Sequence, residues 1–152
     1  MVEIGQKVAD FRLKDEEGKE ISLYNFKGKK VVIYFYPKDN TPGCTKEACS
    51  FRDVYDDIVD AGAVVMGISP DGQTPHKKFK EKFNLPFYLL CDEDHSIAES
   101  FGAWGEKKMY GKSYMGIIRS TFILDENMTV LKTYPKVLPE GHGEEILNAL
   151  RG

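Results

Sequence analysis

The fold is decided by residues 31–53, which read VVIYFYPKDNTPGCTKEACSFRD. The first six residues form a continuous β-prone run, which is typical of a central strand covered on both faces. Residues 37–43 contain two prolines and a glycine and predict a loop. From Cys44 the apolar residues recur at three- and four-residue steps, which predicts an amphipathic helix that ends at Gly62. A strand followed by a short loop and a helix indicates an α/β unit.

The rest of the chain continues this alternation. Residues 11–23 read as a β-hairpin with a glycine in its turn. After the helix we expect strands at residues 63–69 and 87–91, each followed by a helix, at residues 74–83 and 94–101. Two antiparallel strands at residues 120–124 and 129–134 and a closing helix at residues 144–150 complete the order. The segment 103–118 shows no clear period and reads as a long functional loop.

Strands that alternate with helices imply a sheet with parallel core strands and helices on both faces. With the N-terminal β-hairpin and an antiparallel edge, the order predicts an α/β protein with a central mixed sheet flanked by helices. A thioredoxin-like fold has this order, although other α/β folds have it too. No repeat or linker divides the chain, so residues 1–152 are expected to form a single domain.

The composition excludes several classes of function. The chain has 21 Lys and Arg against 24 Asp and Glu, so it lacks the basic footprint of a nucleic-acid-binding protein. No apolar run approaches the roughly 20 residues that span a bilayer, and the charged N-terminus contains no signal-like stretch. We expect a cytoplasmic protein with neither nucleic acid nor a membrane as partner. No stretch reads as a strongly apolar interface, which favours a monomer or a weak dimer.

Cys44 is the first candidate for chemistry. In a reducing compartment, three cysteines are more typical of chemistry, a metal site or core packing than of a disulfide scaffold. Cys44 follows the carboxyl end of the central strand, where open α/β sheets bind their ligands. At a helix start, backbone N–H groups and the helix dipole stabilise a thiolate. Thr41 is a natural N-cap and Pro42 a natural first-turn residue. The polar flanks of Cys44 disfavour a core position.

Cys49 lies five residues further on, in the same expected helix. On an intact helix the two cysteine Cα atoms would be about 8.6 Å apart, whereas disulfides usually need about 6.8 Å or less. A disulfide between them therefore requires the helix start to unwind. The spacing is not the CxxC of an oxidoreductase. The three histidines show no ligand spacing, so we expect neither a metal nor another cofactor. They are His76, His95 and His142.

Two longer motifs resemble a known family. The pattern P-x-x-x-T-x-x-C at residues 37–44 resembles the peroxiredoxin signature. The stretches 41–53, TPGCTKEACSFRD, and 114–122, YMGIIRSTF, are similar to the peroxiredoxin Q (bacterioferritin comigratory protein) subfamily, and the resemblance covers nearly the whole chain. It implies a thioredoxin-like fold and an antioxidant peroxidase that reduces hydrogen peroxide and organic hydroperoxides. It makes Cys44 the peroxidatic cysteine and Cys49 the resolving one.

The same resemblance assigns roles to four more residues. Pro37, Thr41 and Arg119 would shape and charge the pocket, and Glu47 would be the partner of the arginine. The intramolecular disulfide formed in each cycle would be reopened by thioredoxin or glutaredoxin through thiol exchange.

The chemistry of peroxide reduction is consistent with these roles. A free cysteine is only about 3% thiolate at pH 7, so lowering its pKa to about 6 increases the thiolate fraction roughly thirtyfold. Enzymes accelerate reactions at least about a millionfold, so hydrogen-bond donors must also stabilise the departing oxygen. The candidate donors are the Thr41 hydroxyl, the Cys44 backbone N–H and the Arg119 guanidinium.

Two other functions are compatible with such a fold. A thiol–disulfide oxidoreductase would lack its CxxC pair and would not need Thr41 and Arg119, and a holdase would bind unfolded proteins on an exposed apolar surface. Cys91 ends an expected buried strand and reads as a core cysteine. Trp104 and Met109 would either form a rim near the reactive cysteine or pack within the loop.

Overall fold

The apolar run quoted first forms an interior strand of a seven-stranded sheet. A computed structural model describes all residues, 1–152. Strand β3 (Lys30–Phe35) pairs in parallel with β4 (Ala63–Ser69) and antiparallel with β8 (Ser120–Leu124). Because strands flank β3 and side chains cover both of its faces, five of its six residues are buried. This explains why the run shows no polar alternation.

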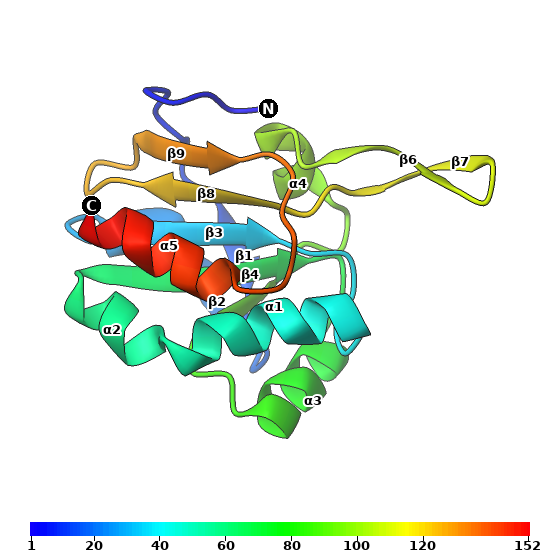
Figure 1. Ribbon diagram of the computed structural model, residues 1–152, viewed down its shortest axis with the longest axis horizontal. Coiled ribbons are helices and arrows are strands. Elements are labelled where there is room, and N and C mark those ends of the chain that lie inside the picture. Colours follow the sequence, from blue (N-terminus) through cyan, green and yellow to red (C-terminus); the bar gives the residue numbers. More distant parts are fainter.

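The sheet has the order β2-β1-β5-β4-β3-β8-β9 (Figure 1). The predicted hairpin forms one edge and the predicted antiparallel pair leads to the other. The remaining sheet strands are β1 (Arg12–Lys14), β2 (Glu20–Ser22), β5 (Tyr88–Cys91) and β9 (Val130–Tyr134). Strands β3, β4 and β5 are parallel, so their carboxyl ends lie at the same edge.

Alternate side chains of β3 point into two separate hydrophobic clusters, because successive strand residues face opposite sides of a sheet. One cluster contains Tyr34 with residues of α1, α2, α3 and α5, and the other contains Phe35 with residues of α4 and the N-terminal segment. Figure 1 shows α1, α2 and α5 on the same side of the sheet. The helical elements are α1 (Pro42–Asp53), α2 (Tyr55–Asp60), α3 (Gln73–Phe83), α4 (Ser96–Phe101), α5 (His142–Arg151) and a 3₁₀ turn at Leu23–Phe26.

This architecture is a thioredoxin-like α/β fold with an N-terminal hairpin, one of the folds that the element order allowed and the one that the family resemblance implied. The single helix expected from Cys44 to Gly62 is wrong in detail. Two helices, α1 and α2, are separated at Val54, whose backbone leaves the helical region. In α2, Ile58 is fully buried, whereas the next apolar residue, Val59, is 49% exposed. No helix in the structure has the length and apolar character needed to cross a bilayer.

The expected loop at 103–118 is instead a second β-hairpin, formed by β6 (Trp104–Met109) and β7 (Lys112–Ile117). Figure 1 shows it projecting away from the main sheet. Its turn residues, Tyr110 and Gly111, both have positive φ, as a two-residue hairpin turn of type I′ requires. Much of this hairpin faces solvent on both sides, so its sequence lacks the apolar alternation by which strands are recognised.

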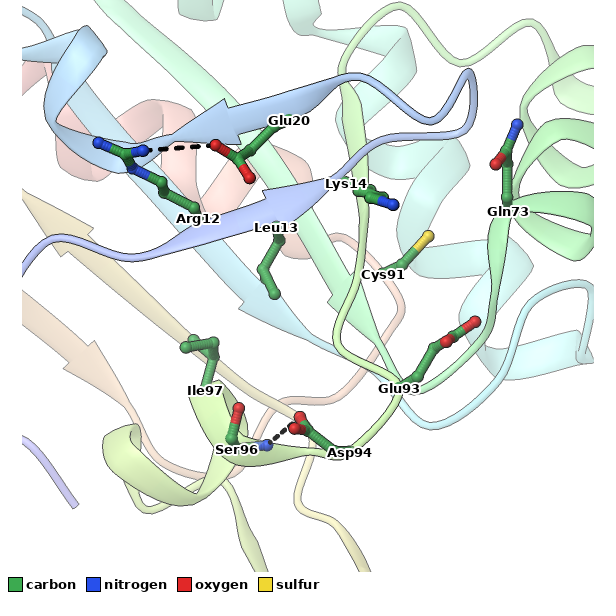
Figure 2. A pocket seen from close by; sticks show the side chains of 10 residues that line it. All are labelled: Arg12, Leu13, Lys14, Glu20, Gln73, Cys91, Glu93, Asp94, Ser96 and Ile97. Atoms are coloured by element: carbon green, nitrogen blue, oxygen red, sulfur yellow. Dashed lines mark hydrogen bonds and ion pairs between the residues drawn. The ribbon is translucent and has the colours of Figure 1, made fainter.

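Cys91 is not a core residue, contrary to expectation. It is the last residue of β5 and is only partly buried, with its Sγ 3.9 Å from the carbonyl oxygen of Asp15. Figure 2 shows its sulfur pointing toward the space between Lys14 and Gln73, in a pocket that all three residues line. The two inner residues of β5, Leu89 and Leu90, are buried, whereas the residues at its two ends, Tyr88 and Cys91, are only partly buried.

Candidate active site around Cys44

Cys44 lies in the first turn of α1 and is 1% exposed. The helix begins at Pro42, after Thr41 in extended conformation at the N-cap, as the sequence predicted. The first intrahelical hydrogen bond runs from the Thr45 N–H to the Thr41 carbonyl at 2.8 Å, so the N–H groups of Gly43 and Cys44 have no backbone acceptor. Such free N–H groups favour negative charge at this position.

Thr41 does not cap the helix with its side chain. Its hydroxyl donates to the Lys38 carbonyl at 3.0 Å and makes no hydrogen bond to Cys44. Pro37 is half-buried in the same loop, directly after β3 and Tyr36. The Tyr36 N–H still bonds the Ile68 carbonyl at 3.1 Å, and Pro37, which has no N–H, cannot extend this pairing.

Arg119 reaches Cys44 because of the sheet register. In the antiparallel β3–β8 pair, Phe35 lies opposite Ser120, so the residue before β8 meets the loop after β3. The Arg119 Nη2 atom donates to the Cys44 Sγ at 3.2 Å. A guanidinium at this distance attracts a thiolate. A Cβ atom on Gly43 would lie 3.3 Å from the same Nη2, so the small residue keeps the approach open.

Glu47 holds the guanidinium from the other side. It lies one helical turn after Cys44, is fully buried, and its Oε1 accepts from Arg119 Nη1 at 2.6 Å. Burial raises the pKa of Glu47 to about 7, and the charge and hydrogen bond of Arg119 oppose the shift. The second oxygen, Oε2, has no hydrogen-bond partner. Because the two nitrogens of one planar group contact Glu47 and Cys44, the carboxylate orients the guanidinium toward the sulfur.

Cys49 lies on the same helix but makes no bond to Cys44, and all three cysteines are free thiols. Cys49 is partly buried, and burial raises its pKa. The structure thus brings together Cys44, Arg119 and Glu47 of the predicted site residues. Pro37 and Thr41 lie on the loop before them, and Cys49 is held apart by an intact helix.

A buried network that the sequence analysis missed anchors this loop. Asp39, also in the loop, accepts from the Tyr36 hydroxyl at 2.6 Å and forms an ion pair with His76 Nδ1 at 2.6 Å. The other ring nitrogen of His76 contacts the Leu90 carbonyl at 2.8 Å, and the Asp39 N–H donates to Asp71 at 2.8 Å. Asp39 follows β3 and Asp71 follows β4, and the carboxyl ends of these neighbouring parallel strands lie at one edge of the sheet. The position of each aspartate just after an apolar strand is visible in the sequence and could have predicted this contact.

His76 is therefore expected to be an imidazolium, since both ring nitrogens face acceptors. Burial by itself lowers the pKa of His76, but the hydrogen bond and charge of Asp39 outweigh it and raise the pKa to about 10. Asp39, Asp71 and His76 place atoms of the kind that bind metals within 4.8 Å of one another. The ion pair between His76 and Asp39 already accounts for the contact between these two residues.

This pair predicts a pH dependence of folding. The pKa of His76 is raised in the folded state. Its contribution to the stability of the fold is therefore complete below its ordinary pKa of about 6.5 and is lost as pH rises toward 10. The free energy of unfolding should fall with pH across that window by at most roughly 1.4 kcal/mol per unit from this residue. Urea unfolding at pH 7, 8 and 9 should show this slope in the wild type and in His95→Gln. It should be absent in His76→Gln, and an unchanged slope there would contradict the assignment.

A thiol that is held at a helix start and contacts a guanidinium indicates an enzyme that uses cysteine as a nucleophile. Comparisons with known proteins identify the family to which this enzyme belongs. A profile of the AhpC/TSA family matches residues 4–133. Peroxiredoxin Bcp of Bacillus subtilis is 51% identical over 150 residues, which cover 99% of this chain and 96% of that protein.

Two solved structures are also similar. One is a cysteine-to-serine mutant of PrxQ from Xylella fastidiosa, with a TM-score of 0.94 and 31% identity, covering 99% of this chain and 96% of that one. The other is the bacterioferritin comigratory protein of Xanthomonas campestris, described for its alkyl peroxide reduction activity. It has a TM-score of 0.88 and 38% identity and covers 93% and 90% of the two chains. The chain belongs to the AhpC/TSA family, in its peroxiredoxin Bcp (PrxQ) branch, and is a thiol-dependent peroxidase.

Proposed function

We propose that this peroxidase reduces hydrogen peroxide and organic hydroperoxides with Cys44 as the peroxidatic cysteine and Cys49 as the resolving one. The observation that carries the proposal is the 3.2 Å contact between Arg119 Nη2 and the Cys44 Sγ at the start of α1. The activity of the Xanthomonas relative on alkyl peroxides supports the substrate class.

In the first step the Cys44 thiolate attacks the terminal oxygen of the hydroperoxide. The S–O bond forms as the O–O bond breaks, and the departing oxygen takes a proton and leaves as an alcohol, or as water from hydrogen peroxide. The sulfur loses two electrons and becomes a sulfenic acid, and the peroxide gains them. Negative charge moves from sulfur to the departing oxygen, so donors beside the sulfur stabilise the transition state.

Arg119 and the Cys44 N–H are the donors available for this charge. The guanidinium is already held by Glu47, so little reorganisation is needed when charge moves onto the peroxide. The Thr41 hydroxyl would have to turn from the Lys38 carbonyl to join them. Pro37 and Thr41 shape the loop that limits access to the sulfur.

In the second step Cys49 attacks the Cys44 sulfenic sulfur. An S–S bond forms, the S–O bond breaks, and the oxygen leaves as water. Both residues lie on one helix, five positions apart, so the first turns of α1 must unwind before the sulfurs can meet. A dithiol protein, thioredoxin or glutaredoxin, then reduces the disulfide by thiol exchange.

Intact mass spectrometry tests the proposal directly. The reduced protein, treated with one equivalent of peroxide, should lose two hydrogen atoms, about 2 Da, as the disulfide forms. The Cys49→Ser variant should instead gain one oxygen atom, about 16 Da, on Cys44. A gain of oxygen in the wild type, with no disulfide, would contradict resolution by Cys49.

The helix that holds both cysteines should respond to the redox state. Amides at residues 44–52 are expected to be protected from hydrogen exchange in the reduced protein and to lose protection in the oxidised one. Each hydrogen bond given up costs roughly 0.5–1.5 kcal/mol net, so two turns can open without global unfolding. The amides of α3 serve as the control and should exchange equally in both states. Equal protection of 44–52 in both states would show that α1 does not unwind.

A further inference from the structure

We propose that His76 is a positioning residue for peroxide reduction, because through Asp39 it holds the loop before α1 in the shape that aligns hydrogen-bond donors with the Cys44 sulfur. The inference rests on the proposed role of Cys44. The loop comprises residues 37–41, between the end of β3 and the start of α1. His76 lies in α3, and its ring nitrogens contact Asp39 and the Leu90 carbonyl rather than the cysteine, so it would act through the loop.

Asp39 is a buried carboxylate in a loop whose other charged and polar side chains face solvent. It is 7% exposed, whereas its neighbours Lys38 and Asn40 are exposed. Burying a charge is costly unless the charge is paired and hydrogen-bonded. Both oxygens of Asp39 have such partners, the Tyr36 hydroxyl and His76 Nδ1, each at 2.6 Å. The cost of burial therefore ties the position of the loop to the position of these two partners.

The backbone after Asp39 adopts a conformation that needs a tether. Asn40 has a φ of 60°, in the left-handed region that residues other than glycine seldom occupy. Such a conformation persists when the surrounding contacts determine it. Asn40 joins Asp39 directly to Thr41, the N-cap of α1. Releasing Asp39 should therefore let Asn40 return to a more common conformation and shift the start of the helix.

Hydrogen bonds connect the loop to the first turn of α1. The Thr41 hydroxyl donates to the Lys38 carbonyl at 3.0 Å, and the Thr41 carbonyl accepts from the Thr45 N–H at 2.8 Å. Cys44 lies within this turn, and its sulfur accepts from Arg119 at 3.2 Å. A shift of the loop would change how the Cys44 N–H and sulfur face the bound peroxide. Misplacing reacting groups by about 1 Å can cost about 10²-fold in rate.

Two substitutions of His76 separate the bond to Asp39 from the packing of the ring. Phenylalanine keeps a planar ring in the buried site but donates no hydrogen bond. Asparagine loses the ring but places a side-chain N–H close to the position of Nδ1, which bonds Asp39. If the bond to Asp39 positions the loop, asparagine should rescue the reaction and phenylalanine should not.

The measurement is the single-turnover rate of Cys44 oxidation by hydrogen peroxide, followed by rapid mixing without any reductant. The rate of alkylation by iodoacetamide, measured beside it, reports the thiolate alone. His76→Phe should be oxidised roughly 10²-fold more slowly than the wild type, because the donors no longer meet the departing oxygen, while its alkylation changes by no more than about threefold. His76→Asn should be oxidised within about fivefold of the wild-type rate.

His95→Phe is the matched control, because it makes the same replacement at a histidine that stacks on Trp104 at the start of α4. It should leave both rates unchanged. The proposal is overturned if His76→Phe is oxidised at the wild-type rate, or if its oxidation and alkylation rates fall by the same factor. It is also overturned if His76→Asn is as slow as His76→Phe, because the bond to Asp39 would then not be what matters.

Tyr36→Phe keeps the test decisive if urea unfolding shows that His76→Phe does not fold. It removes one bond to Asp39 and leaves the contact with His76 in place. Oxidation should then be slower by roughly fivefold, the factor that corresponds to one hydrogen bond of ordinary strength, and an unchanged rate would overturn the proposal. Failure of the proposed function has a different result, since Cys44 of the wild type would then not be oxidised by peroxide.

Discussion

Replacing Cys44 with serine is expected to reduce peroxide consumption to the uncatalysed background, a loss of at least about a millionfold. Serine is nearly isosteric with cysteine, so the buried first turn of α1 should keep its packing. A hydroxyl at neutral pH is not ionised, and its oxygen cannot form the sulfenic intermediate. The measurement is hydrogen peroxide consumption at saturating dithiothreitol, with circular dichroism to establish the fold.

Cys91→Ser is the control for this result. Cys91 ends β5, which β4 separates from β3, the strand that leads to Cys44. We expect this variant to consume peroxide at the wild-type rate. Residual turnover in Cys44→Ser that disappears in the Cys44→Ser/Cys91→Ser double variant would show that the wrong cysteine had been assigned.

Replacing Arg119 with methionine should have the second largest effect, a decrease of roughly 10²–10³-fold in the rate of Cys44 oxidation. Methionine keeps much of the apolar stem but removes the donor that lies 3.2 Å from the sulfur. The decrease should exceed what the smaller thiolate fraction explains, because the guanidinium also stabilises charge on the departing oxygen. The effect on the thiolate fraction can be separated from the effect on the departing oxygen by measuring alkylation with iodoacetamide, whose rate reports the thiolate alone. Both the peroxide and the alkylation rates are measured across one pH range.

The Arg119→Met variant also removes the partner of Glu47. Burial then acts on the pKa of Glu47 without the opposing charge, so the carboxyl group should become protonated, which limits the cost to the fold. Arg12→Met, at an exposed arginine on β1, is the control and should react normally. If the peroxide and alkylation rates of Arg119→Met fall by the same factor, Arg119 does not act on the departing oxygen.

The sequence alone was sufficient where a local pattern determines structure. The run from Val31 to Tyr36 predicted β3 to within one residue at each end, because a strand covered on both faces must be apolar throughout. The prolines and glycine of the next loop predicted the start of α1 and placed Cys44 in its first turn. The same reasoning failed at residues 103–118, where a hairpin facing solvent has no apolar pattern to detect.

The tertiary structure alone decided which side chains meet. Arg119 is 75 positions from Cys44, and their contact depends on the β3–β8 register, which local patterns do not specify. The Asp39–His76 pair likewise joins the loop after β3 to the first turn of α3, at the carboxyl edge of the parallel strands. A helix or strand forms from residues a few positions apart, so its pattern is visible in the chain. A reactive site forms where distant segments pack together, so its distances and charges exist only after the chain has folded.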